Sequence, residues 1–171
     1  FREMGADGIV VGILTKEGEI DLENMKSFIS EAQNIPVTFH RAFDVCKNPL
    51  EAFYELKKIG VKAILTSGQE ENCLKGKQLL KKLVEHSNKD NKNKIEIIVG
   101  AGLNILNIGE IKNFTDANNF HFSGKKVRKS GMEYKKQDIN MGIKGFSEFE
   151  ILETDEKIVQ EVSEYLKKTI N

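Results

Sequence analysis

Hydrophobic residues in this sequence follow two alternating patterns. Short apolar runs rich in β-branched residues are typical of strands in a parallel sheet that is covered on both faces. Between these runs, apolar residues recur at helical spacing. The runs begin about every 24 to 33 residues, which is the period of a β-plus-α unit. They cover residues 8–13, 36–41, 63–66, 95–99 and 119–124.

Capping residues mark the ends of two predicted helices. Asp21 is placed to cap a helix that continues to residue 32. Asn48 followed by Pro49 is typical of a helix start, and Gly60 is typical of a helix end. The pattern therefore predicts helices directly after the first and second strands.

The remaining segments are less regular. A polar run over residues 87–94 predicts an exposed connection, and residues 125–150 read as irregular. An amphipathic pattern then predicts a C-terminal helix over about residues 155–170.

Five β/α units fit two architectures. One is a complete open sheet of the flavodoxin type. The other is the last five units of a (β/α)8 TIM-type barrel, an α/β fold whose first three units would precede this sequence. Residues 1–5 read like the last turn of a helix and its terminal glycine, which favours the barrel. We therefore expect a single partial barrel domain over residues 1–171.

Ionisable residues gather where the second predicted strand ends, and ligands bind at that end of parallel strands. His40, Arg41 and Asp44 lie in this stretch, and strand alternation points His40 and His121 toward the barrel lumen. Either histidine alone fits a hydrogen-bonded core residue equally well. Together the four residues predict a catalytic site. His40 would be its acid–base group, Asp44 would orient His40, and Arg41 would pair with an anion.

Glycine-rich turns close the third, fourth and fifth predicted strands. Free backbone N–H groups in such turns can hold an anion, although tight turns need glycine for structural reasons too. In an eight-unit barrel, the last two turns follow strands seven and eight, which is the usual phosphate site of the fold. The predicted anion-binding residues are Ser67, Gly68, Gly100, Gly102, Ser123 and Gly124.

Two cysteines fall in loops at the same predicted end of neighbouring strands. Cys46 lies beyond His40, and Cys73 lies beyond Ser67. Thiolates hold Cu(I) well, with imidazole in support, so Cys46 and Cys73 are candidate copper ligands. Their spacing is not a metal motif, and the alternative is that each is a small packed residue.

Composition narrows the function classes. The chain has 171 residues, of which 39% are hydrophobic and 30% are charged, and its net charge is zero. A general attraction to nucleic acid or to an acidic membrane is therefore not expected. No apolar run approaches the length of a membrane span, and no signal-peptide pattern opens the sequence, so we expect a cytoplasmic protein with free thiols.

Several of these motifs occur in an order and spacing that resemble the CutC family, the copper homeostasis protein family. The resemblance implies a (β/α) barrel in a cytosolic, sometimes nuclear, protein that associates into homo-oligomers. It also implies Cu(I) binding or handling. The motifs are Thr-Phe-His-Arg-Ala-Phe-Asp at 38–44, Leu-Thr-Ser-Gly at 65–68, Gly-Ala-Gly at 100–102, Phe-His-Phe-Ser at 120–123 and Ser-Gly-Met at 130–132.

Three functions remain open from the sequence. The first is a copper-handling protein that uses Cys46 and Cys73. The second is a barrel enzyme or sensor for a small phosphorylated or carboxylated molecule, built on His40 and Arg41. The third is a scaffold on a barrel that has lost its chemistry.

Overall fold

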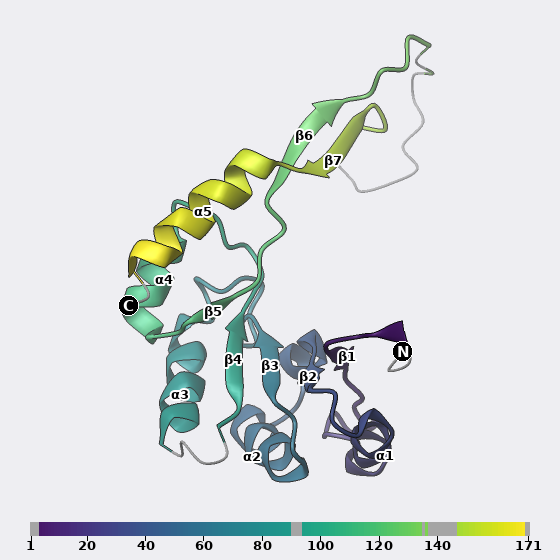
Figure 1. Ribbon diagram of the computed structural model, residues 1–171, viewed down its shortest axis with the longest axis vertical. Helices are drawn as coiled ribbons and strands as arrows, with labels where there is room; N and C mark the ends of the chain where they lie inside the picture. Colours follow the sequence, from purple (N-terminus) through teal and green to yellow (C-terminus); the bar gives the residue numbers. More distant parts are fainter. Residues whose placement is uncertain (1–3, 90–93, 135, 137–146, 170–171) are drawn as a thin grey trace. The chain divides into compact units, whose positions relative to one another are not determined.

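The computed structural model describes residues 4–89, 94–134, 136 and 147–169 (Figure 1). Residues 1–3, which were predicted to end a helix, lie outside this set, as do residues 90–93 of the polar connection. The chain divides into two compact units, Phe1–Phe122 and Ser123–Asn171, and each is described by itself. The expectation of a single domain over the whole chain stays a prediction.

The first unit is built on a five-stranded parallel sheet. Its strands are paired in the order β1-β2-β3-β4-β5. Sequential order of this kind is that of a barrel, whereas a flavodoxin-type sheet has the order 2-1-3-4-5. The strands are β1 (Ile9–Val11), β2 (Val37–Phe39), β3 (Ala63–Thr66), β4 (Glu96–Val99) and β5 (Asn119–Phe120).

Helices alternate with these strands along the chain, which confirms the predicted α/β class (Figure 1). A short 3-10 helix, η2, follows β2 directly and contacts β3. This placement carries the residues that follow β2 over the end of its neighbour. The helices are α1 (Leu22–Ala32), η2 (Arg41–Val45), α2 (Pro49–Ile59), α3 (Lys77–Asn88) and α4 (Ile108–Thr115).

All four predicted helix-end residues occupy the expected positions. Asp21 caps α1, since its side chain accepts a hydrogen bond from the Asn24 backbone N–H at 3.0 Å. Pro49 opens α2, and Gly60 ends it in the left-handed conformation with φ 93°. Asn48 is the N-cap residue of α2 as predicted, although its side chain makes no capping hydrogen bond and its amide donates to Glu51 at 3.1 Å.

The two faces of the sheet are buried to different extents. Phe39, Ile64 and Ile97 lie in one register row and are all fully or almost fully buried. On the other face, Leu65 and Ile98 are only partly buried. Val10 of β1 is 64% exposed, so the first strand is not covered on both faces as its sequence predicted. β1 is an edge strand of this sheet, and its outward row therefore meets solvent.

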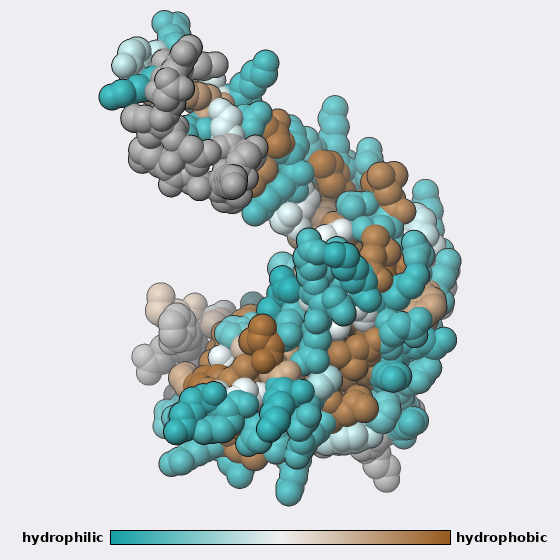
Figure 2. Space-filling model, turned by 180° about the vertical axis from the view of Figure 1, so that it is seen from behind, coloured by the Kyte–Doolittle hydropathy of each residue, from teal (hydrophilic) through white to brown (hydrophobic). Residues whose placement is uncertain are grey.

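The first unit carries single exposed apolar residues among many charged ones. Figure 2 shows one face of the molecule as largely hydrophilic, with hydrophobic areas scattered between polar side chains. Within the described residues, no helix has the length and apolar character needed to cross a membrane.

The second unit contains an antiparallel pair of strands and the C-terminal helix. β6 (Lys125–Lys129) pairs with β7 (Glu150–Thr154), and α5 spans Glu156–Thr169, close to the predicted bounds. The expectation that residue 125 begins an irregular segment was wrong. The strand pattern is hidden by charge, because every residue of β6 is exposed and its Arg128 pairs across the ladder with Glu153 at 2.7 Å.

Two glycines let the loop after β3 close on itself. A Cβ on Gly68, whose φ is +81°, would lie 2.3 Å from the Gly76 carbonyl oxygen. A Cβ on Gly76 would lie 1.9 Å from the Ser67 carbonyl oxygen. The backbones of these segments therefore approach more closely than any side chain allows.

We predict that Gly68→Ala destabilises the protein far more than Gly60→Ala does. Both positions have a positive φ, but nothing lies within 4 Å of a Cβ on Gly60. Gly60→Ala is expected to lower the free energy of unfolding by about 1–2 kcal/mol through backbone strain alone. Gly68→Ala adds a backbone clash and is expected to lower it by more than about 3 kcal/mol. Urea unfolding of both variants measures the difference, and equal losses would contradict the close approach.

Candidate functional site

A cluster of polar groups lies at the carboxyl ends of β2 and β3. η2 continues from β2 and contributes Arg41 and Asp44, with His40 as its cap residue. β3 ends in Thr66, and Ser67 follows it. The structure therefore brings together residues that are more than 20 positions apart in the sequence.

Asp44 is the centre of this cluster. Its carboxylate accepts hydrogen bonds from Thr66 Oγ1 at 2.5 Å, from the Ser67 backbone N–H at 3.0 Å and from the Gln69 backbone N–H at 3.3 Å. It also accepts from Arg41 Nε at 2.6 Å. The Asp44 side chain is only 7% exposed. These contacts satisfy both carboxylate oxygens inside the protein.

The same contacts set the charge of Asp44. Burial by itself would raise the pKa of this carboxyl, because desolvation disfavours the charged form. The hydrogen bonds from Thr66, Arg41 and the backbone outweigh burial and hold the pKa below its ordinary value of 3.8. Asp44 is therefore a carboxylate at neutral pH.

Arg41 is fixed on one side and open on the other. Its Nε donates to Asp44, and its Nη2 donates to Ser67 Oγ at 3.1 Å. The Ser67 hydroxyl in turn donates to the Glu70 carbonyl oxygen at 2.6 Å. The Arg41 side chain is still 47% exposed. A guanidinium has five N–H donors, so three remain beyond these two bonds.

The His40 ring is held by a backbone N–H two residues further along the chain. The Ala42 N–H donates to His40 Nδ1 at 3.1 Å, so Nδ1 carries a lone pair and not a proton. This hydrogen bond assigns the neutral imidazole to the tautomer with hydrogen on Nε2. Asp44 was predicted to orient His40. Its carboxylate oxygens accept hydrogen bonds from Arg41, from Thr66 and from the Ser67 backbone N–H. A catalytic role for His40, Arg41 and Asp44 stays a prediction.

The N–H groups predicted to hold an anion are partly used by the fold. Ser67 N–H donates to Asp44, Gly68 N–H donates to Thr66 Oγ1 at 2.9 Å, and Gly100 N–H donates to the Thr66 carbonyl at 2.9 Å. Gly102 has φ +75° and closes the turn after β4. These hydrogen bonds show that the N–H groups of Ser67, Gly68 and Gly100 hold the turns in place.

Three further predicted site residues follow β5. His121 is exposed, and its backbone N–H extends the ladder to the Val99 carbonyl at 2.8 Å. Ser123 and Gly124 belong to the second unit, so their part in an anion site stays a prediction.

Both thiols are buried and free. Burial raises the pKa of Cys46 to about 11, although a hydrogen bond from Gln69 opposes this shift. Burial also raises the pKa of Cys73. Copper binds the thiolate, so both groups would have to lose a proton on binding. Among the described residues, no group of three or more His, Cys, Asp or Glu side chains is arranged to hold a metal ion.

Cys46 also lines a cavity of about 70 Å³ between residues 18–20 and the start of α2. Three carboxylates surround this cavity, from Glu19, Glu51 and Glu55. Burial and the neighbouring Glu51 and Glu19 raise the pKa of Glu55. The cavity is therefore electrostatically suited to cations, in contrast to the side of Arg41.

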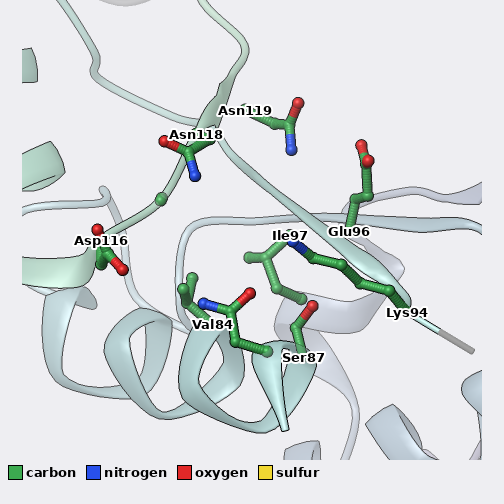
Figure 3. A pocket seen from close by; sticks show the side chains of 10 residues that line it. Val84, Ser87, Lys94, Glu96, Ile97, Asp116, Asn118 and Asn119 are labelled. Atoms are coloured by element: carbon green, nitrogen blue, oxygen red, sulfur yellow. The ribbon is translucent and has the colours of Figure 1, made fainter. Parts of the chain in front are cut away.

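A second cavity lies at the opposite end of the sheet, where β4 and β5 begin (Figure 3). Ser87 of α3, Lys94 and Glu96 are among its lining residues. Its volume of about 20 Å³ holds about one water molecule. This volume is too small for an organic ligand.

Gln69 is a positioning residue that the sequence did not reveal. Its side-chain amide donates to the Cys46 carbonyl at 2.6 Å and to the Phe43 carbonyl at 3.2 Å. Its backbone has φ 59°, which is uncommon for a residue with a side chain. Gln69 therefore fastens the loop after β3 to η2, and only the positive φ, invisible in the sequence, would have marked it.

Comparisons with known proteins agree on one family. The CutC family model matches residues 1–126. A protein named family protein CutC from Bacteroides fragilis is 40% identical over 170 residues, covering 99% of this chain and 66% of the relative. The human copper homeostasis protein cutC homolog is 37% identical over 152 residues, covering 88% of this chain and 54% of the relative. This chain thus spans between about half and two thirds of the length of these relatives.

A solved structure supports the fold. The crystal structure of CutC from Streptococcus agalactiae superposes with a TM-score of 0.64 and 32% sequence identity. The match covers 70% of this chain and 57% of that chain. With the sequential parallel strand order, it confirms the predicted class, an α/β fold that corresponds to part of a TIM-type barrel.

We predict that Asp44→Asn lowers the free energy of unfolding by about 2–4 kcal/mol at neutral pH, because an amide would place N–H donors against the donors of this site. The pKa of Asp44 is lowered in the folded state, so its contribution is complete above the ordinary value of 3.8 and is lost as the pH falls through the lower folded value. The difference between wild type and variant should therefore shrink in acid. Urea unfolding at several pH values measures it.

Asp7→Asn provides the matched control, because Asp7 is an exposed carboxylate of the same unit. It should change the free energy of unfolding by no more than about 0.5 kcal/mol. A difference between wild type and Asp44→Asn that persists unchanged to the lowest pH would show that the Asp44 charge is not what stabilises the cluster.

Proposed function

The chain belongs to the CutC family, and we propose that its Asp44 cluster binds a small carboxylated or phosphorylated molecule through Arg41 and His40. The observation that carries this proposal is the state of Arg41. Two of its donors are bound to Asp44 and Ser67, and the rest of the guanidinium is open to solvent. A guanidinium held in this way has already lost most of its side-chain freedom, so a ligand does not have to order it.

Charge supports the same proposal. Asp44 neutralises part of the Arg41 charge, but it is buried while the guanidinium reaches solvent. The exposed side of the pair is therefore cationic. Carboxylate and phosphate groups match the planar donors of Arg and bind them with charge-assisted hydrogen bonds.

His40 offers a second donor near the end of β2. It precedes Arg41 directly, and its Nε2 is the nitrogen not used by the Ala42 N–H. A neutral imidazole that donates from Nε2 favours an oxygen acceptor on the ligand. In this proposal the site belongs either to a sensor or to an enzyme that polarises an oxygen of its substrate. The proposed protein is cytoplasmic and self-associates.

Copper handling is the second candidate function. The human and mouse relatives carry the name copper homeostasis protein cutC homolog. In this chain the feature that favours it is the acidic cavity beside Cys46, since three carboxylates there would attract a cation to a buried thiol. The residues that would bind Cu(I) are Cys46 and Cys73, each after losing its proton.

We predict that Arg41→Gln weakens the binding of orthophosphate or succinate at least about tenfold, because a charge-assisted pair of hydrogen bonds is lost. Isothermal titration of the wild type and the variant measures the change. Arg41→Lys keeps the charge but loses the planar donors, and a similar loss is expected. Thermal unfolding of each variant separates lost binding from lost folding.

Lys94→Gln is the control for net charge, because Lys94 lies at the far end of the sheet (Figure 3). Its affinity for both anions should equal that of the wild type. If Arg41→Gln and Lys94→Gln behave alike, Arg41 is not the anion site.

For the copper candidate, we predict that Cys46→Ser and Cys73→Ser each weaken Cu(I) binding by at least about tenfold. The reduced protein is titrated with Cu(I) against a competing chelator. Because burial raises the pKa of Cys46 to about 11, binding at neutral pH should release protons and tighten as the pH rises. An unchanged affinity in the double variant would exclude these thiols.

A further inference from the structure

Gly12 lies just beyond β1 and directly beside the His40 ring. A Cβ built on Gly12 would lie 2.6 Å from His40 Nδ1 and 2.7 Å from Cε1. Both distances are shorter than real carbon contacts allow. The imidazole thus occupies the space that any other residue at position 12 would fill with its side chain.

The backbone on either side of the ring fixes its position further. The His40 N–H donates to the Val11 carbonyl at 3.2 Å, which ties the end of β2 to β1 next to Gly12. The Ala42 N–H donates to Nδ1 from the other side. The Phe39 ring, which is fully buried, lies 3.2 Å from the same Cβ position.

We propose that Gly12 and the Ala42 N–H are the positioning groups that hold His40 as a neutral hydrogen-bond donor. The ring can occupy this place only because residue 12 has no side chain. In this place Nδ1 accepts a hydrogen bond from a fixed N–H, so the hydrogen of the neutral ring is on Nε2. This inference rests on the proposed function and deepens it.

The consequence concerns the class of ligand. His40 Nε2 offers a ligand a hydrogen and no lone pair, as the free N–H groups of Arg41 do. Each suits a carboxylate, phosphate or carbonyl oxygen. A metal ion needs a lone pair on nitrogen, so it cannot bind Nε2 of neutral His40 without breaking the Ala42 hydrogen bond.

The same constraint refines the role expected of His40 from the sequence. A neutral imidazole with hydrogen on Nε2 cannot accept a proton at Nε2. It can polarise a ligand oxygen by donating a hydrogen bond to it, as an electrophile does. His40 therefore assists as a donor rather than as a base.

Gly12→Ala tests the proposal because it moves the ring with little cost to the backbone. The φ of Gly12 lies outside the left-handed region, so alanine is sterically allowed there. The closest clash is with the end of a side chain that can rotate away. Gly8→Ala is the matched control, since its Cβ would meet nothing nearer than the Pro36 carbonyl at 3.7 Å.

The first measurement is the tautomer of His40, read from two-bond ¹H–¹⁵N correlation spectra of the full chain without ligand. The sequence has three histidines, so His40→Gln assigns the signal. We expect the Nε2–H pattern in the wild type and in Gly8→Ala, and its loss or mixing in Gly12→Ala. An Nδ1–H pattern in the wild type, or an unchanged pattern in Gly12→Ala, would overturn the proposal.

The second measurement is the affinity for orthophosphate and succinate. Gly12→Ala should weaken binding by at least about threefold, whereas Gly8→Ala should not change it. Binding that stays equal to wild type while the tautomer changes would overturn the link to the ligand. If the wild type has the expected tautomer but binds neither anion, the proposed function fails while the positioning of His40 stands.

Discussion

The hydrogen-bonded carboxylate of Asp44 is the contact on which the rest of the site depends. It joins the segment after β2 to the segment after β3, because Arg41 lies in the first and Thr66, Ser67 and Gln69 lie in the second. A buried carboxylate is costly unless nearly every lone pair is satisfied. The two loops must therefore be in place together. Arg41 is held in position because it donates one of the hydrogen bonds that satisfy Asp44. Within this unit, rigidity of the site and stability of the fold have the same origin.

This set of hydrogen bonds also decides which groups are left for a ligand. The backbone N–H groups of Ser67, Gly68 and Gly100 are engaged in holding the loops. The open donors at this end of β2 and β3 belong to side chains, Arg41 above all. A site of this kind selects for charge and planarity more than for the shape of a phosphate, because guanidinium donors lie in one plane. It differs in this respect from a cradle built of glycine N–H groups at a helix start.

Local features of the fold could be predicted from the sequence, and long-range ones could not. The strand period, the cap at Asp21 and the end of α2 at Gly60 depend on neighbouring residues and were confirmed. The ionisable stretch at 40–44 was also found, but the partners of Asp44 were not, since Thr66 and Gln69 lie 22 and 25 residues away. β6 was missed because cross-strand ion pairs, not an apolar face, mark its pairing. The burial of Cys46 and the role of Gly12 depend on packing, which no spacing records.

The two candidate functions are physically linked through Gln69. Its side chain holds the Cys46 carbonyl and donates to the Cys46 sulfur at 3.4 Å, while its backbone N–H donates to Asp44. A metal ion on Cys46 would share the sulfur with the Gln69 amide and would alter the contact that now positions this side chain. Movement of Gln69 would then remove one of the donors that hold Asp44, and with it part of the support of Arg41. Copper at the thiol and an anion at the guanidinium are therefore expected to influence each other, since each draws on the same short loop after β3.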